Sequence, residues 1–229
     1  MLCLATGWCA FKEQRRFNLG DGSVYAFDYL DKVFFPYHMK QVNFDARFVY
    51  ESKGDIDPYY NHDIPESARS AIYAKNLKHH FGWFASVLMG AQYSLVNNCD
   101  MVYIEQDALV FGLKEALDWA KGKKIVYGFG DVSWCPGWAE HSFFYVSHEF
   151  LGAFLSILNG CRIHENDRVL PEISWHTLFK GVADFWPYPY GRKRPIDFNL
   201  ETPFYAQQLR STEIKEFQNK LERKLNEST

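Results

Sequence analysis

Two acidic residues, one position apart, follow the strongest strand signal in the sequence. Residues 101–104 are all apolar, and Glu105 and Asp107 come directly after them. Two carboxylates this close in a folded chain repel each other unless a proton or a cation lies between them. A hard divalent cation with oxygen ligands, Mn²⁺ or Mg²⁺, removes the repulsion and can also neutralise a bound diphosphate.

The same pair has a simpler explanation as an acidic turn in water at the end of a strand. Its neighbours argue against that explanation, because the preceding strand is apolar enough to be buried on both faces and residues 108–110 are apolar again. In open α/β sheets, ligands bind beyond the carboxyl ends of the strands. We therefore predict a metal site around Glu105 and Asp107.

Residues 128–141 form an unusual loop that contains three glycines, one proline and two tryptophans. It is either a surface loop anchored by its aromatic side chains or a platform for an acceptor sugar, with stacking rings and hydrogen-bonding polar groups. The sequence favours neither explanation. The candidate acceptor-binding residues are Trp134, Trp138, Glu140 and His141, and Asp131 is a further group that could bond a hydroxyl.

Glu172 follows Pro171 at the expected start of a helix. A carboxylate in this position complements the positive end of the helix dipole. It could instead act as a general base that deprotonates an acceptor hydroxyl. Taken alone, the residue fits the first role slightly better.

A short basic cluster, Arg192, Lys193 and Arg194, follows a segment with two tyrosines and a glycine. It is either a solvated basic loop or a flexible lid over a diphosphate, in which a cation stabilises the leaving group. The histidines are scattered and show no spacing typical of a metal site.

Apolar runs and turn residues predict an alternation of strands and helices along the chain. We expect strands at residues 2–6, 47–50, 101–104, 125–127 and 142–146. We expect helices at residues 28–41, 65–96, 113–121, 148–158 and 175–180, the last three ending at Gly122, Gly160 and Gly181. Apolar residues at helical spacing near the C-terminus predict one more, amphipathic helix: Ile214, Phe217, Leu221 and Leu225. This alternation predicts an α/β fold with a mixed, mainly parallel central sheet flanked by helices.

The composition suits one globular domain of 229 residues, with 47% hydrophobic and 18% aromatic residues. A net charge of −3 gives no general attraction to nucleic acid. Five cysteines without a CxxC pair indicate free thiols rather than a disulfide framework or a zinc site. Because the sequence has neither a membrane-spanning apolar run nor a signal-peptide pattern, we expect a cytoplasmic protein, or one bound peripherally to a membrane.

A long helix, an apolar strand, an acid-x-acid triplet and a second apolar segment together resemble the nucleotide-sugar-binding half of GT-A-type glycosyltransferases. The hallmark of that family is the DxD motif, which here reads Glu105-Gln106-Asp107. The resemblance implies a single Rossmann-like GT-A domain, with a nucleotide-sugar half (residues 1–112), an acceptor half (113–200) and a helical tail (201–229). It also implies that Asp107 binds the metal directly, and that Glu105 binds the metal, a metal-bound water or the ribose.

Looser positional matches to the family extend over about residues 1–180. They imply nucleotide contacts from the end of the first strand, the end of the second strand and the helix before the triplet: Thr6, Gly7, Trp8, Glu51, Lys75 and Asn76. With the family match, Glu172 becomes the first choice for the catalytic base and Asp131 the second. The implied reaction moves a sugar from a UDP- or GDP-linked donor to a carbohydrate acceptor, as in polysaccharide biosynthesis.

Two other functions remain open. A sugar nucleotidyltransferase shares the fold class, but its Gly-rich loop with Arg and Lys is missing, since Gly7 is followed by Trp8, Cys9 and Ala10. A non-catalytic carbohydrate-binding domain would keep the Trp-rich loop and lose metal-dependent nucleotide binding. Neither GxxxxGK[ST] nor GxGxxG occurs, which disfavours P-loop and dinucleotide-binding enzymes.

Overall fold

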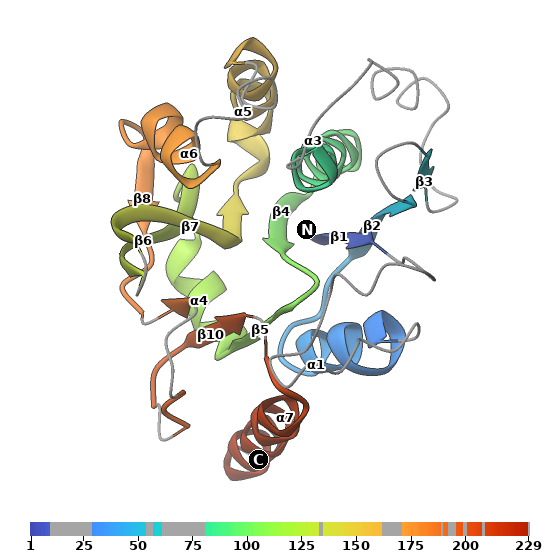
Figure 1. Cartoon of the computed structure of the whole chain (residues 1–229), viewed down its shortest axis with the longest axis vertical. Helices are drawn as coiled ribbons and strands as arrows, with labels where there is room; N and C mark the ends of the chain where they lie inside the picture. Colours follow the sequence, from blue (N-terminus) through green and yellow to red (C-terminus); the bar gives the residue numbers. More distant parts are fainter. Residues whose placement is uncertain are drawn as a thin grey trace.

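The computed structural model describes residues 1–9, 29–53, 57–60, 81–132, 135–161, 171–188, 190–191, 196–198, 201–207 and 209–228. Within these ranges the largest element is a central sheet (Figure 1). Its strands are β1 (Leu2–Cys9), β2 (Ala46–Lys53), β3 (Asp57–Tyr60), β4 (Asp100–Ile104), β6 (Ile125–Val132), β7 (Cys135–Val146) and β8 (Ala183–Phe185). They lie side by side in the order β3-β2-β1-β4-β7-β6-β8.

Most strands of the central sheet run in one direction. β1 is parallel to both β2 and β4, and β6 is parallel to β8. β7 is antiparallel to its neighbours β4 and β6, and β3 is antiparallel to β2. The mixed, mainly parallel sheet predicted from the sequence is therefore confirmed, and β7 is the strand that makes its interior mixed.

Helices cover both faces of this sheet (Figure 1). One face packs against α3 (Phe81–Val96), α5 (His148–Cys161) and α6 (Pro171–Phe179). The other packs against η1 (Leu30–Phe34), α1 (Phe35–Met39), α4 (Leu113–Ala120) and α7 (Ser211–Glu227). A small second sheet lies on that side too, in the order β5 (Ala108–Phe111), β10 (Phe204–Gln207), β9 (Tyr190–Gly191). Successive apolar residues of β1, β4 and the paired parts of β6 and β7 point alternately into the two cores, as the period-two geometry of a strand requires.

The amphipathic C-terminal helix is confirmed as α7. Ile214, Phe217 and Leu221 are buried, and Leu225 packs partly buried against the same core. The helix begins at Ser211, after the four-residue strand β10, which the sequence analysis did not predict. Among the described residues, no helix combines the length and the apolar character needed to span a bilayer.

Other predicted boundaries differ at glycines. β1 continues through Gly7 to Cys9, because Gly7 pairs with Tyr50 and packs tightly against α3, where an added Cβ would lie 2.9 Å from Ser86 Oγ. The predicted end of a helix at Gly160 is wrong, since α5 continues to Cys161. Gly122 does follow α4 with a φ of +79°, in the left-handed region that suits a helix end.

Candidate functional site

The strand order reverses at β1, which places β2 on one side of it and β4 on the other. In an α/β sheet, ligands bind at such a switch point, beyond the carboxyl ends of the two diverging strands. Glu105 is the first residue after β4. The acid pair therefore lies at the position that the fold makes available to a ligand.

The triplet forms a tight turn between the two sheets. The Ala108 N–H donates to the Glu105 carbonyl oxygen at 3.0 Å, and the Glu105 N–H donates to the Ser142 carbonyl oxygen at 2.8 Å. β5 then starts at Ala108, immediately after Asp107. The turn is thus fixed on one side by β7 and on the other by the second sheet.

Gln207, at the end of β10, contacts both acids. Its Nε2 donates to Glu105 Oε2, and to Asp107 Oδ1 at 3.2 Å. The β5–β10 pairing sets Gln207 opposite Ala108, and the side chain is only 2% exposed. This residue was not predicted from the sequence, although a polar residue at the end of the apolar run 203–206 was a signal that could have found it.

An irregularity in β7 brings further polar groups to Glu105. Between the pairs Tyr127↔Phe144 and Gly128↔Glu140, the β6–β7 register shifts, and the extra β7 residues turn toward β4. The Ser142 hydroxyl donates to Glu105 Oε2 at 2.8 Å and lies 3.5 Å from Glu140 Oε1. Bulges of this kind often redirect side chains at functional sites.

Glu140 and His141 therefore lie beside the acid pair and are buried, with exposures of 1% and 5%. His141 Nδ1 is 3.9 Å from Glu105 Oε1. On its other side the His141 ring packs against Trp83 of α3, with ring centroids 4.2 Å apart, and near Trp175 of α6. Both residues were predicted to bind an acceptor, and that role stays a prediction; the structure shows both side chains buried, with His141 beside Glu105.

Two buried tyrosines lie close to the carboxylates. Burial raises the pKa of Tyr103 well above its ordinary value, and the charges of Glu105 and Asp107 add to this. Burial, followed by the charge of Asp107, likewise raises the pKa of Tyr29. Both phenols therefore stay protonated at neutral pH. The Tyr103 hydroxyl is hydrogen-bonded to Ser86 Oγ at 2.6 Å.

Side chains of α1 and of the turn that follows it hold the outer edge of β5. His38 Nδ1 donates to the Phe34 carbonyl oxygen at 2.8 Å, so its Nε2 accepts the Val110 N–H at 3.2 Å. Gln41 donates to the Val110 carbonyl oxygen at 2.8 Å and accepts the Leu113 N–H at 2.9 Å. Burial lowers the pKa of His38 to about 3, which keeps the imidazole neutral. Neither residue was singled out from the sequence.

Of the remaining predicted site residues, some lie within the described part of the chain and the others lie outside it. Thr6 and Gly7 lie in β1, and the paired backbones of Trp8 and Glu51 continue toward the same edge of the sheet. Asp131 and Trp138 lie in β6 and β7, and Glu172 lies in the first turn of α6, with only the backbone described. Outside the described residues lie Lys75, Asn76, Trp134, Arg192, Lys193 and Arg194. The roles assigned to all of these residues stay predictions.

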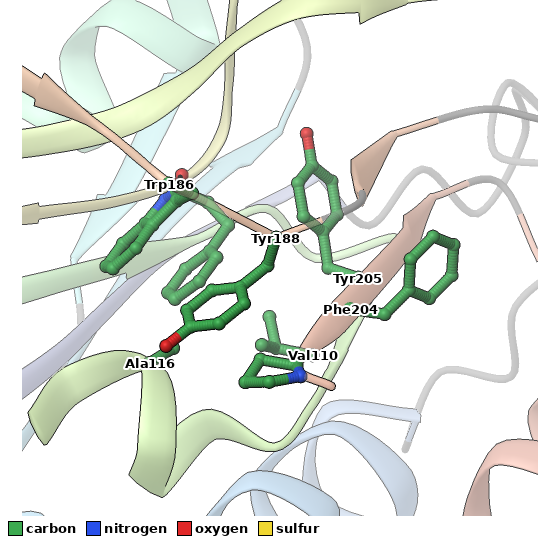
Figure 2. A pocket seen from close by; sticks show the side chains of 8 residues that line it. Val110, Ala116, Trp186, Tyr188, Phe204 and Tyr205 are labelled. Atoms are coloured by element: carbon green, nitrogen blue, oxygen red, sulfur yellow. Dashed lines mark hydrogen bonds between the residues drawn. The ribbon is translucent and has the colours of Figure 1, made fainter. Parts of the chain in front are cut away.

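A small aromatic cavity lies on the α4 side of the second sheet (Figure 2). Its walls include Val110, Ala116, Trp186, Tyr188, Phe204 and Tyr205. Trp186 stacks on Phe143 and donates its indole N–H to the Phe143 carbonyl oxygen at 3.1 Å. With a volume of about 10 Å³, the cavity has room for one water-sized molecule and cannot hold a sugar nucleotide.

The acid pair can share a cation. Within the described residues, no group of three or more His, Cys, Asp and Glu side chains is arranged to hold a metal ion. Glu105 and Asp107, however, both reach the same nitrogen atom of Gln207, so one cation can reach both carboxylates. Oxygen donors of this kind suit Mg²⁺ and Mn²⁺.

No protein-family model matches the sequence, and no curated protein sequence matches it significantly. Among solved structures, the chain is similar to one described as the "crystal structure of a glycosyltransferase involved in the glycosylation of the major capsid of PBCV-1". The two share 8% sequence identity with a TM-score of 0.54, over 96% of this chain and 98% of the other. The chain has the fold of a glycosyltransferase. At this identity the likeness concerns the fold alone.

Proposed function

We propose that the protein is a glycosyltransferase that moves a sugar from a nucleoside-diphosphate donor to a saccharide acceptor with the help of a divalent cation. The observation that supports this most strongly is the position of Glu105 and Asp107. They follow β4 at the switch point of the sheet, and their carboxylates converge on one nitrogen atom. The likeness in fold to a glycosyltransferase supports the same reaction class.

In this proposal Glu105 and Asp107 hold Mn²⁺ or Mg²⁺. The bound cation supplies charge neutralisation for the diphosphate leaving group. Ser142 orients Glu105 by donating its hydroxyl hydrogen to Oε2, which leaves Oε1 on the His141 side. Thr6, Gly7, Trp8 and Glu51 bind the nucleotide along the ends of β1 and β2, with Lys75 and Asn76 completing that site.

The acceptor half of the site is proposed on the side of β6, β7 and α6. Glu172, in the first turn of α6, is the proposed base, and Asp131 near the end of β6 is the second choice. A base there takes the proton of the acceptor hydroxyl as that oxygen bonds to the sugar. Trp134 and Trp138 stack on the acceptor, and Arg192, Lys193 and Arg194 stabilise the leaving diphosphate.

The direct test is turnover with UDP- and GDP-linked sugars in Mn²⁺ and in a chelator. A glycosyltransferase releases the nucleoside diphosphate, slowly to water and faster with a suitable saccharide. Release of pyrophosphate from a nucleoside triphosphate and a sugar 1-phosphate would identify a nucleotidyltransferase instead. Saccharide binding without turnover of any donor would identify a carbohydrate-binding domain and overturn the proposal.

A further inference from the structure

Gln207 reaches the acid pair from the far end of the sequence, 100 residues after Asp107. Its backbone is fixed by the pairing of β10 with β5, in which Ala206 faces Leu109 and Gln207 faces Ala108. Because the side chain is 2% exposed and Asp107 is 9% exposed, water has little access to this contact. The amide is thus a built-in partner of the two carboxylates.

The chemistry of an amide makes this position unusual. Two neighbouring carboxylates need hydrogen-bond donors when no cation is present, and they share a cation best with a further oxygen ligand. A glutamine amide carries two N–H donors at one corner and a carbonyl oxygen at the other. The torsion that exchanges the two corners is broad and roughly two-fold, so either corner can face the acids.

Other side chains of similar length provide one of these functions or neither. A lysine would occupy the place of the cation permanently, and a glutamate would add a third negative charge. A leucine would leave the carboxylates without this donor in a site that is largely closed to water. Glutamine can donate a hydrogen bond to the two carboxylates when no cation is bound and can offer an oxygen ligand when one is.

We propose that Gln207 is an exchangeable partner of the acid pair. Its amide N–H group holds Glu105 and Asp107 together in the cation-free chain, as the structure has it, and its carbonyl oxygen becomes a ligand when the cation binds. The first half of the proposal concerns the cation-free protein alone. The second half rests on the proposed metal-dependent function.

Two substitutions of Gln207 distinguish its role as a hydrogen-bond donor from its role as a metal ligand, and a third substitution is the control. Gln207→Glu keeps the length, offers oxygen and removes the donor, whereas Gln207→Leu removes both donor and ligand. Gln218→Glu, a half-buried position on α7, makes the same change of charge elsewhere. The measurements are the melting temperature in a chelator and the affinity for Mn²⁺ by calorimetry, the latter with and without a nucleoside diphosphate.

For Gln207→Glu we expect a lower melting temperature without metal and a higher affinity for Mn²⁺. Without metal it should melt at least about 3 °C below both the wild type and Gln218→Glu. It should nevertheless bind Mn²⁺ at least about tenfold more tightly, so that Mn²⁺ raises its melting temperature more than it raises that of the wild type. Gln207→Leu should have both a lower melting temperature in the chelator and a lower Mn²⁺ affinity, about tenfold weaker than wild type.

A Gln207→Glu protein as stable in the chelator as Gln218→Glu would overturn the holding role. Unchanged Mn²⁺ affinity in both Gln207 variants would overturn the ligand role. If Gln207→Leu fails to fold, Gln207→Glu still decides both halves. If no protein binds Mn²⁺, the metal-dependent function fails and the ligand role with it, while the melting temperatures in the chelator still decide the holding role.

Discussion

Glu105 and Asp107, which follow β4, differ in the side chains that contact them. Glu105 accepts hydrogen bonds from Ser142 and Gln207 and faces His141, and Asp107, just before β5, also accepts a hydrogen bond from Gln207. Glu105 is therefore held from both sheets, by Ser142 of β7 and Gln207 of β10, whereas Gln207 reaches Asp107 from the second sheet. This arrangement supports the assignment of Asp107 as the direct ligand and of Glu105 as the residue with more than one role.

The proposed base gives a prediction at the same scale. Glu172→Gln keeps the shape of the side chain and removes its basicity, so turnover should fall by at least about 100-fold while donor affinity stays near wild type. Steady-state kinetics with a saccharide acceptor measure this. Glu149→Gln is the matched control, because Glu149 is also an acid in the first turn of a helix, α5. A loss below about tenfold would reduce Glu172 to a helix-start acid and move the search to Asp131.

The position of the acid pair at the end of a buried strand was predictable from the sequence because its signal is local: an apolar strand, two carboxylates and a second apolar run. Gln207 and Ser142 were not, because they reach Glu105 through strand pairings across 102 and 37 residues. No local pattern encodes the register of such pairings. The bulge that brings Ser142 to Glu105 likewise became visible only in the fold.

At the scale of elements, His38 of α1 and Gln41, two residues after that helix, take the place of a neighbouring strand along β5. Among the described strands Val110 pairs with β10, and on its other side its N–H and carbonyl groups bond to His38 and Gln41. Buried backbone groups need such partners. Because Asp107 directly precedes β5, this contact also fixes the position of the second acid.

The neutral, buried His38 predicts a pH dependence of stability. Its pKa is about 3 in the folded protein and 6.5 ordinarily, so between these values the unfolded chain binds more protons and stability falls as the pH falls. Well above pH 6.5 His38 is neutral in both the folded and the unfolded chain, so its titration takes no stability from the fold there. Lowering the pH from about 7 to about 5.5 should remove about 1 kcal/mol of unfolding free energy that His38→Gln does not lose.

Urea unfolding at the two pH values measures the difference, because the other titrating groups are common to both proteins. His38→Gln should be less stable than wild type at neutral pH and should show a smaller loss on acidification. Equal losses in the two proteins would mean that His38 does not stay neutral in the fold.

The long elements were predictable because each carries its own periodicity and end signals. β4, α4 and α7 are examples, and α4 ends just before the predicted Gly122. β5 and β10 were missed, because a run of four apolar residues does not distinguish a strand from a loop that packs on a core. The contact of Gln207 with the acid pair depends on these two short strands, which is why that contact was not predicted from the sequence.

At the scale of the whole molecule, α7 packs against the second sheet. Phe217 packs against Phe198, Phe204 and Tyr37, and so joins the C-terminal helix to β10 and α1. Ion pairs from Lys224 to Glu115 and from Lys40 to Glu222 lie around this core. The C-terminal helix therefore supports the strand that carries Gln207.

Removing that contact should destabilise the whole domain. Phe217→Ala should cost about 3 kcal/mol or more, since a buried phenylalanine leaves a cavity that the core fills only in part. For a chain of this size that lowers the melting temperature by roughly 6–12 °C. Lys215→Ala, at an exposed position of the same helix, should change stability by less than about 0.5 kcal/mol. Equal effects of the two substitutions would mean that α7 is not docked as described.

The class of the fold followed from the alternation of strands and helices, but the strand order did not. Placing β4 beside β1, and β7 between β4 and β6, depends on crossovers that the sequence does not specify locally. That order creates the switch point at which Glu105 and Asp107 lie. The function proposed for the molecule therefore depends on an architecture that only the structure revealed.

The most direct test of this account is the calorimetric affinity for UDP and GDP with Mn²⁺ and with a chelator. Asp107→Asn is compared with wild type, and Asp184→Asn, exposed on β8 at the edge of the sheet, is the matched control. Wild type and Asp184→Asn should bind one nucleotide at least about tenfold more tightly with Mn²⁺. Asp107→Asn should lose that gain and stay folded, and Glu105→Gln should lose part of it. Affinity that is the same with and without Mn²⁺ in wild type, or a full Mn²⁺ gain in Asp107→Asn, would contradict the assignment of a metal-dependent nucleotide-sugar site to this acid pair.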